Sequence, residues 1–157
     1  MRSLIFGDLH SHNYREFSKL NKDGMNTRLL EGILSLAKIT LSGLEEKIDE
    51  VWFVGDLYHL KNNLDSQVIQ ATVTGMRELA EQFPLVLVPG HHDLYLWSSN
   101  PIMLELLKDF SDNITVISKP GWIIRQGVDI YVEPCTRKIL DLMKRIETLK
   151  VVGEESI

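Results

Sequence analysis

Three short stretches of the sequence carry side chains that bind divalent metals, and each one follows an apolar run. They are residues 7–10 (Gly-Asp-Leu-His), 55–59 (Gly-Asp-Leu-Tyr-His) and 90–93 (Gly-His-His-Asp). Carboxylate oxygens beside imidazole nitrogens suit a divalent cation of intermediate softness. A helix-capping aspartate or a surface histidine would explain any one stretch alone. The three together, in the same setting, favour a metal centre.

The elements that must position these side chains follow from the apolar pattern. Short apolar runs that end at a glycine indicate buried strands, and apolar stripes spaced by three and four residues indicate helices. Asn26 is a suitable cap for the first helix. Helices are predicted at residues 27–47, 66–82, 101–110 and 137–151. Strands are predicted at residues 4–6, 50–54, 85–88 and 114–117, with a hairpin of residues 122–125 and 128–132.

The alternation of strands and helices predicts an α/β fold with a parallel sheet and right-handed crossovers, to which the closing hairpin adds an antiparallel part. The carboxyl ends of parallel strands meet at one edge, where open α/β sheets bind ligands. Asp8 and His10 are two residues apart on an extended chain, so their side chains point to the same side. We therefore expect the three stretches to converge at this edge.

The composition fits one globular domain of 157 residues, with 44% hydrophobic and 25% charged residues. A formal net charge of −5 argues against gripping nucleic acid by bulk electrostatics, while a DNA substrate bound locally at a metal site stays compatible. The lone cysteine, Cys135, excludes an internal disulfide framework and fits a reducing compartment. No stretch approaches the roughly 18 to 20 apolar residues of a membrane helix. We expect a cytoplasmic protein with no membrane partner.

In their order and spacing, the three stretches resemble the signature of the calcineurin-like metallophosphoesterases: D-x-H, then G-D-x-x-H, then G-N-H-D or G-N-H-E. The resemblance runs from Asp8 to Glu133-Pro134. The second stretch is most similar to the SbcD-like DNA repair exonuclease branch, and residues 8–30 resemble its bacteriophage-encoded members. The resemblance implies the N-terminal part of a four-layer α/β/β/α sandwich, with a largely parallel sheet and a C-terminal hairpin.

The resemblance also implies a set of metal ligands. Asp8 and His10 match ligands of a first metal, Asp56 matches the carboxylate that bridges two metals, and His91 stands at a ligand of the second. His91 is a departure, because the family usually has asparagine there. Imidazole favours manganese, iron or zinc over magnesium. We expect two Mn²⁺ ions, with iron and zinc as alternatives.

Three further residues match groups that act on the substrate in this family. His92 matches the histidine that protonates the leaving oxygen or steadies the transition-state charge, and Asp93 matches the acid that orients it. His59 matches a histidine that positions substrate in the nuclease branch; a surface residue at a helix start is the other interpretation. The implied reaction is hydrolysis of a phosphodiester, DNA in the nuclease branch, by a water activated between two metals.

No histidine follows His92 in this sequence. The family has two more motifs there, a lone histidine after a strand and Gly-His-x-His, so residues 1–157 are interpreted as a single domain incomplete at its C-terminus. Three explanations stay open: a fragment or split-gene product, a degenerate relative acting as a binding or assembly module, and a minimal hydrolase. An incomplete domain would expose an apolar sheet face unless a second polypeptide or a second copy covered it.

Overall fold

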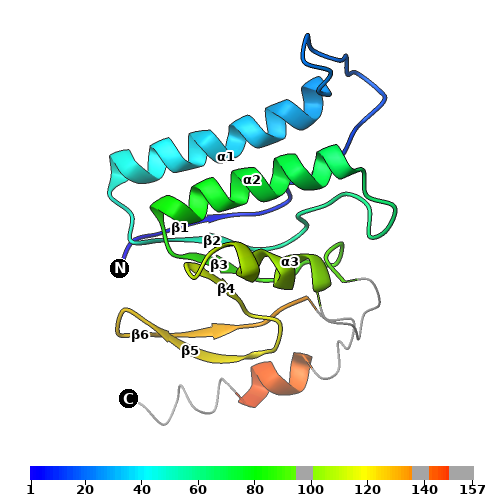
Figure 1. Cartoon of the computed structure of the whole chain (residues 1–157). Helices are drawn as coiled ribbons and strands as arrows, with labels where there is room; N and C mark the ends of the chain where they lie inside the picture. The colour runs from blue at the N-terminus through cyan, green and yellow to red at the C-terminus, as the bar shows by residue number, and fades with distance from the viewer. Residues whose placement is uncertain (95–100, 136–141, 149–157) are drawn as a thin grey trace.

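A parallel four-stranded sheet forms the centre of the computed structural model, which describes residues 1–94, 101–135 and 142–148. Its strands lie in chain order, each paired with the next (Figure 1). They are β1 (Ser3–Phe6), β2 (Glu50–Phe53), β3 (Leu85–Leu87) and β4 (Ile114–Val116). A separate antiparallel hairpin consists of β5 (Gly121–Arg125) and β6 (Val128–Val132). The predicted fold class, a largely parallel α/β sheet with a C-terminal hairpin, is confirmed.

The two long helices begin where the sequence predicted. In α1 (Thr27–Glu46) the Asn26 side chain accepts hydrogen bonds from the backbone N–H groups of Arg28 and Leu29, at 3.0 and 3.3 Å. In α2 (Ser66–Gln82) the Asp65 carboxylate accepts from the Gln67 N–H at 2.8 Å. Both caps satisfy N–H groups that the first helical turn leaves without partners.

The helix predicted at residues 101–110 is shorter in the structure. α3 spans Ile102–Leu107 and tightens into the 3₁₀ turn η1 (Lys108–Phe110), a common way for a helix to end. Within the helix predicted at residues 137–151, residues 142–148 are helical, and the rest of that prediction lies outside the described residues. Arg145 of this segment bonds to the Glu133 carboxylate, which follows β6, at 2.6 and 3.0 Å.

Side chains alternate between the two faces of the central sheet, as the period of a strand requires. On β2, Val51 and Phe53 join the core beneath α1, α2 and α3, whereas Trp52 faces the other way. Trp52 packs there with Val86, Val88 and Val132 under the hairpin. The layers are therefore helices, sheet, hairpin and the helical segment 142–148 (Figure 1).

The hairpin leaves part of its side of the sheet uncovered. Ile5 on β1 is 64% exposed and Val54 after β2 is 50% exposed. Both line an apolar hollow of about 590 Å³ between β1, β2 and β6. Among the described residues, no helix combines the length and apolarity needed to cross a bilayer.

A buried carboxylate joins the two sheets. Glu50, at the start of β2, is 1% exposed and accepts hydrogen bonds from Trp52 Nε1 at 2.6 Å and Arg125 Nε at 3.0 Å. The Ser3 hydroxyl lies 3.2 Å from the same carboxylate. A charge buried this deeply needs a cation and hydrogen bonds to offset its lost hydration.

We expect Arg125→Ala to lower the free energy of unfolding by about 2 to 3 kcal/mol, because Glu50 then keeps its buried charge without a cation. Urea unfolding followed by circular dichroism measures this. The matched control is Arg77→Ala, which removes an exposed arginine paired with Glu81 at 3.8 Å and should cost less than about 0.5 kcal/mol. Equal losses in the two variants would show that the Glu50 contact does not anchor the hairpin.

Candidate metal centre

The loops that follow β1 and β2 are hydrogen-bonded to each other beyond the ends of the strands. The N–H of Asp8 donates to the Gly55 carbonyl, and the N–H of His10 donates to the Asp56 carbonyl, each at 2.9 Å. The Ser11 N–H donates to the Leu57 carbonyl at the same distance. These bonds fix the register of two segments almost fifty residues apart and place their acids and imidazoles side by side.

Three candidate ligands have a left-handed backbone conformation, which residues other than glycine rarely adopt. The φ angles are 55° at Asp8, 45° at His10 and 64° at Asp56. Each such residue costs on the order of 1 to 3 kcal/mol and persists only where its surroundings fix it. They are three of the seven non-glycine residues with positive φ that the described chain contains. This concentration of strain at one sheet edge marks a site built for a purpose other than stability.

The third loop, after β3, approaches the second so closely that both contacting residues must be glycine. A Cβ on Gly55, whose φ is 106°, would overlap the backbone nitrogen of Gly90. A Cβ on Gly90 would overlap the Asp56 carboxylate. Glycine at both positions therefore lets the His91-His92 segment reach Asp56.

Asp93 braces these two loops through their backbones. Its carboxylate accepts N–H bonds from Asp56 at 2.7 Å, Leu57 at 2.9 Å and Gly90 at 2.8 Å. Burial raises the pKa of Asp93, the three N–H bonds oppose that shift, and the nearby Asp56 charge adds to it. The resemblance implied that Asp93 orients the His92 ring, but its oxygens face the backbone instead. Asp93 thus positions Asp56 rather than contacting the imidazole.

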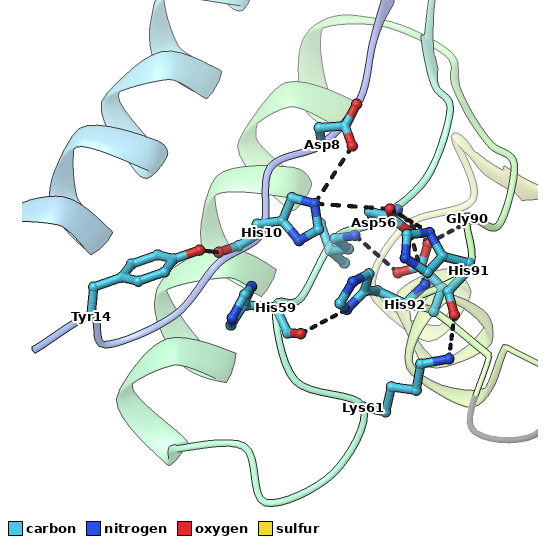
Figure 2. Close-up of polar contacts among 11 residues, drawn as sticks. Asp8, His10, Tyr14, Asp56, His59, Lys61, Gly90, His91 and His92 are labelled. Carbon is cyan, nitrogen blue, oxygen red and sulfur yellow. Dashed lines mark hydrogen bonds and ion pairs between the residues drawn. The ribbon is translucent and has the colours of Figure 1, made fainter. Parts of the chain in front are cut away.

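One carboxylate oxygen lies at the centre of the cluster (Figure 2). Asp56 Oδ2 is 3.0 Å from His91 Nδ1 and 3.8 Å from His10 Nε2, and His10 Nε2 is 3.5 Å from Asp8 Oδ1. The Asp56 side chain is 8% exposed, whereas that of Asp8 is largely exposed. Asp56 therefore stands between the ligands predicted for a first metal and the ligand predicted for a second.

His92 enters the cluster through its ring and its backbone. Its Nδ1 lies 2.7 Å from the His59 carbonyl oxygen, an acceptor, so Nδ1 carries a proton and Nε2 is left for other partners. Its backbone N–H donates to Asp56 Oδ1 at 2.8 Å. His10, Asp56 and His92 each offer a ligand atom, and these atoms lie within 4.8 Å of one another.

The donor set fits a divalent transition metal. Two ligands at about 2.1 Å from one cation lie about 3 to 3.5 Å apart when their angle is near 90 to 110°. The separations around Asp56 Oδ2, 3.0 and 3.8 Å, bracket that range. His10 Nδ1 is buried with no partner in the described part of the chain, so the polar neighbours of this ring are the carboxylates at Nε2. Imidazoles and carboxylates together suit manganese, iron or zinc.

His59 stands on the outer side of the cluster, between His92 and a group of aromatic rings. Its ring is nearly parallel to that of His92, with centroids 5.8 Å apart, and it lies 5.3 Å from the rings of both His12 and Tyr14. Partial burial, followed by the neighbouring imidazoles, lowers the pKa of His59. The structure thus gathers all the predicted site residues, and the carboxylate of Asp93 is engaged by backbone N–H groups.

Two residues outside the predicted set contact the site. The Tyr14 hydroxyl donates to the His10 carbonyl at 3.2 Å, and Lys61 Nζ donates to the His91 carbonyl at 2.6 Å. Lys61 lies two residues after His59, but from the sequence alone a solvated loop is the better interpretation of that position. Tyr14 carries no signal of spacing or type, because its contact depends on how the loop after β1 folds back.

The parallel sheet with its C-terminal hairpin and the group of metal-binding side chains are consistent with a metallophosphoesterase fold. The chain belongs to the calcineurin-like phosphoesterase family, whose model matches residues 1–146. It is also similar to an uncharacterised protein of Acanthamoeba polyphaga mimivirus, with 30% identity over 76 residues. That match covers 48% of this chain and 6% of the viral protein, so the chain spans a small part of the length of that relative.

Proposed function

We propose that this protein is a metal-dependent phosphoester hydrolase that acts on phosphodiesters. The observation that carries the proposal is the position of Asp56 Oδ2 between His10 on one loop and His91 on another. A single carboxylate placed in this way can serve two cations, the arrangement that phosphoester hydrolysis by paired metals requires. Membership of the calcineurin-like phosphoesterase family supports the same reaction.

The residues that would hold the metals are Asp8, His10, Asp56 and His91. When bound, the metal ions would polarise the phosphoester and lower the pKa of the water that attacks phosphorus. We propose Mn²⁺ as the preferred ion, since imidazole ligands disfavour magnesium. Asp93 contributes by accepting the backbone N–H bonds of Asp56, whose φ is 64°, and of Gly90, so it holds the two loops together.

We propose that His92 donates a proton from Nε2 to the leaving oxygen. Its Nδ1 proton is already engaged by the His59 carbonyl, so the ring orientation is fixed with Nε2 free of that bond. The backbone N–H of His92 donates to Asp56 Oδ1 at 2.8 Å, which holds this residue beside the carboxylate at the centre of the cluster. An imidazole whose Nδ1 is hydrogen-bonded and whose Nε2 can face the substrate has the geometry that a general acid needs.

Chelation tests the proposal directly. Protein dialysed against EDTA should lose hydrolysis of bis-p-nitrophenyl phosphate, and Mn²⁺ should restore it better than Mg²⁺. Mn²⁺ should also raise the melting temperature of the chelated protein, because a ligand that binds only the folded state stabilises it. Activity that survives EDTA would contradict the proposal. A melting shift without hydrolysis under any of Mn²⁺, Zn²⁺, Fe²⁺ or Mg²⁺ would favour a binding module that has lost catalysis.

A further inference from the structure

A large cleft, lined by charged, polar and apolar side chains, adjoins the metal-ligand cluster. The cleft holds about 1050 Å³ and lies between the loop of residues 12–20, the N-terminal end of α1 and the segment after His59. His59 lines the cleft, and its ring is also parallel to that of His92 in the cluster. A ligand in the cleft would therefore lie directly beside any group that reacts at the metal centre.

Aromatic rings lead from the cluster into the cleft. Behind His59 come Tyr14 and His12, whose ring centroids are 5.0 Å apart. Figure 2 shows Tyr14 and His59 on the same side of His10, away from Asp56. Phe17, in the same loop, is 93% exposed, and Leu20 is 72% exposed and lines the cleft. His12, Tyr14 and His59 line the cleft, and aromatic rings in such a lining are surfaces on which flat, unpaired bases stack.

Cations line the same cleft. The Arg28 guanidinium lies 4.3 Å from the centre of the Tyr14 ring, and Arg15 and Lys19 are exposed on the opposing loop. Two acids, Glu16 and Asp65, also line the cleft, and the Asp65 carboxylate is engaged in capping α2. The guanidinium of an arginine presents its N–H groups in a fixed planar fork that phosphate oxygens accept.

Hydrogen bonds hold the loop of residues 12–20 in place on one side of the cleft. Asn26 accepts from the first N–H groups of α1 and donates from Nδ2 to the Tyr14 carbonyl at 2.7 Å. The Tyr14 hydroxyl in turn donates to the His10 carbonyl at 3.2 Å. Arg28, through Tyr14, is thus tied to the same loop that carries a candidate metal ligand.

We propose that this cleft binds an unpaired nucleotide of a single-stranded nucleic acid, next to the phosphodiester that is hydrolysed. The base stacks against the rings of the 12–20 loop and the adjacent phosphate pairs with Arg28. This inference rests on the proposed function of the metal centre. A duplex hides the faces of its bases, and a chain with net charge −5 lacks the bulk positive charge that grips duplex backbones. The local pairing of rings with cations therefore favours the single strand.

The test compares Arg28→Ala with the matched control Arg77→Ala, an exposed arginine on α2 remote from the cleft lining. Two substrates are used, a short single-stranded oligothymidylate and the small bis-p-nitrophenyl phosphate. Arg28→Ala should raise KM for the oligothymidylate about tenfold and lower the ratio of kcat/KM values between the two substrates by a similar factor. Arg28→Lys, which keeps the charge but not the planar fork, should restore only part of the loss. Arg77→Ala should move neither value.

Binding separates failure of the cleft from failure of the metal centre. Fluorescence anisotropy with labelled oligothymidylate is measured in Asp56→Asn protein, with and without Arg28→Ala. Weaker binding on loss of Arg28, together with a wild-type protein that hydrolyses neither substrate with metal present, would support the cleft and contradict the proposed reaction. Equal effects of Arg28→Ala on both substrates, or equal binding of single strand and duplex of the same length, would overturn the cleft proposal.

Discussion

Asp56→Asn is expected to reduce metal-dependent hydrolysis of bis-p-nitrophenyl phosphate by at least about a thousandfold, which corresponds to about 4 kcal/mol of transition-state stabilisation. Asparagine has the same shape, so its amide oxygen can still accept the His92 N–H bond that Oδ1 accepts now. The second oxygen, which faces His10 and His91, becomes an uncharged NH₂ group that cannot ligate a cation. The variant thus removes the shared ligand and little else.

The matched control is Asp129→Asn, which makes the same chemical change at an exposed position on β6. Its hydrolysis rate and its melting temperature should equal those of the wild type. Asp56→Asn should also lose the rise in melting temperature on Mn²⁺ addition, a readout independent of turnover. If Asp56→Asn keeps both its activity and its Mn²⁺ shift, Asp56 is no metal ligand and the proposed reaction falls with it.

Gly55→Ala is expected to lower the free energy of unfolding by about 4 kcal/mol or more, among the largest effects a single methyl group can have. Two costs add. The backbone at Gly55 has φ of 106°, where alanine is strained, and the added Cβ would overlap the backbone of Gly90, which cannot turn aside as a side chain can. Urea unfolding measures the loss, and failure of the variant to accumulate in folded form would agree with it.

Substitutions at two glycines of the β5–β6 hairpin measure the two costs separately. Gly127 has φ of 77° with open space around its Cα, so Gly127→Ala carries the backbone strain alone, about 1 to 2 kcal/mol. Gly121 has neither positive φ nor a close neighbour, and Gly121→Ala should change stability by less than about 0.5 kcal/mol. A Gly55→Ala loss no larger than that of Gly127→Ala would show that the loops after β2 and β3 can move apart.

Most of the fold could be predicted because its signals are local. The glycine-ended apolar runs placed the strands to within a residue, and the stripe from Thr27 with its Asn26 cap placed α1. Predicted helix ends were less accurate after residue 100, where α3 becomes a 3₁₀ turn at Lys108. Helix ends depend on weak capping contacts, which tertiary packing easily shifts.

The sequence predicted which residues form the cluster but not how their side chains are oriented. Parallel strands bring Asp8, Asp56 and His91 to one edge in any such fold, so their meeting follows from strand order. That Asp93 faces backbone N–H groups, and that the His92 ring bonds to the His59 carbonyl, depends on how the loops fold back at positive φ. Local propensity disfavours those conformations, so no sequence pattern announces them.

By itself, the sequence determined which metal-binding side chains this protein has and the order of strands that delivers them to one edge, because both depend on residue type and on periodicity along the chain. Tertiary structure alone decided that Asp56 Oδ2 lies between two imidazoles. It also decided that the Arg28 guanidinium lies against the Tyr14 ring in the lining of the adjoining cleft. Those contacts join loops and a helix distant along the chain, held by backbone hydrogen bonds and by the close approach of Gly55 and Gly90, and they arise only once the sheet has formed.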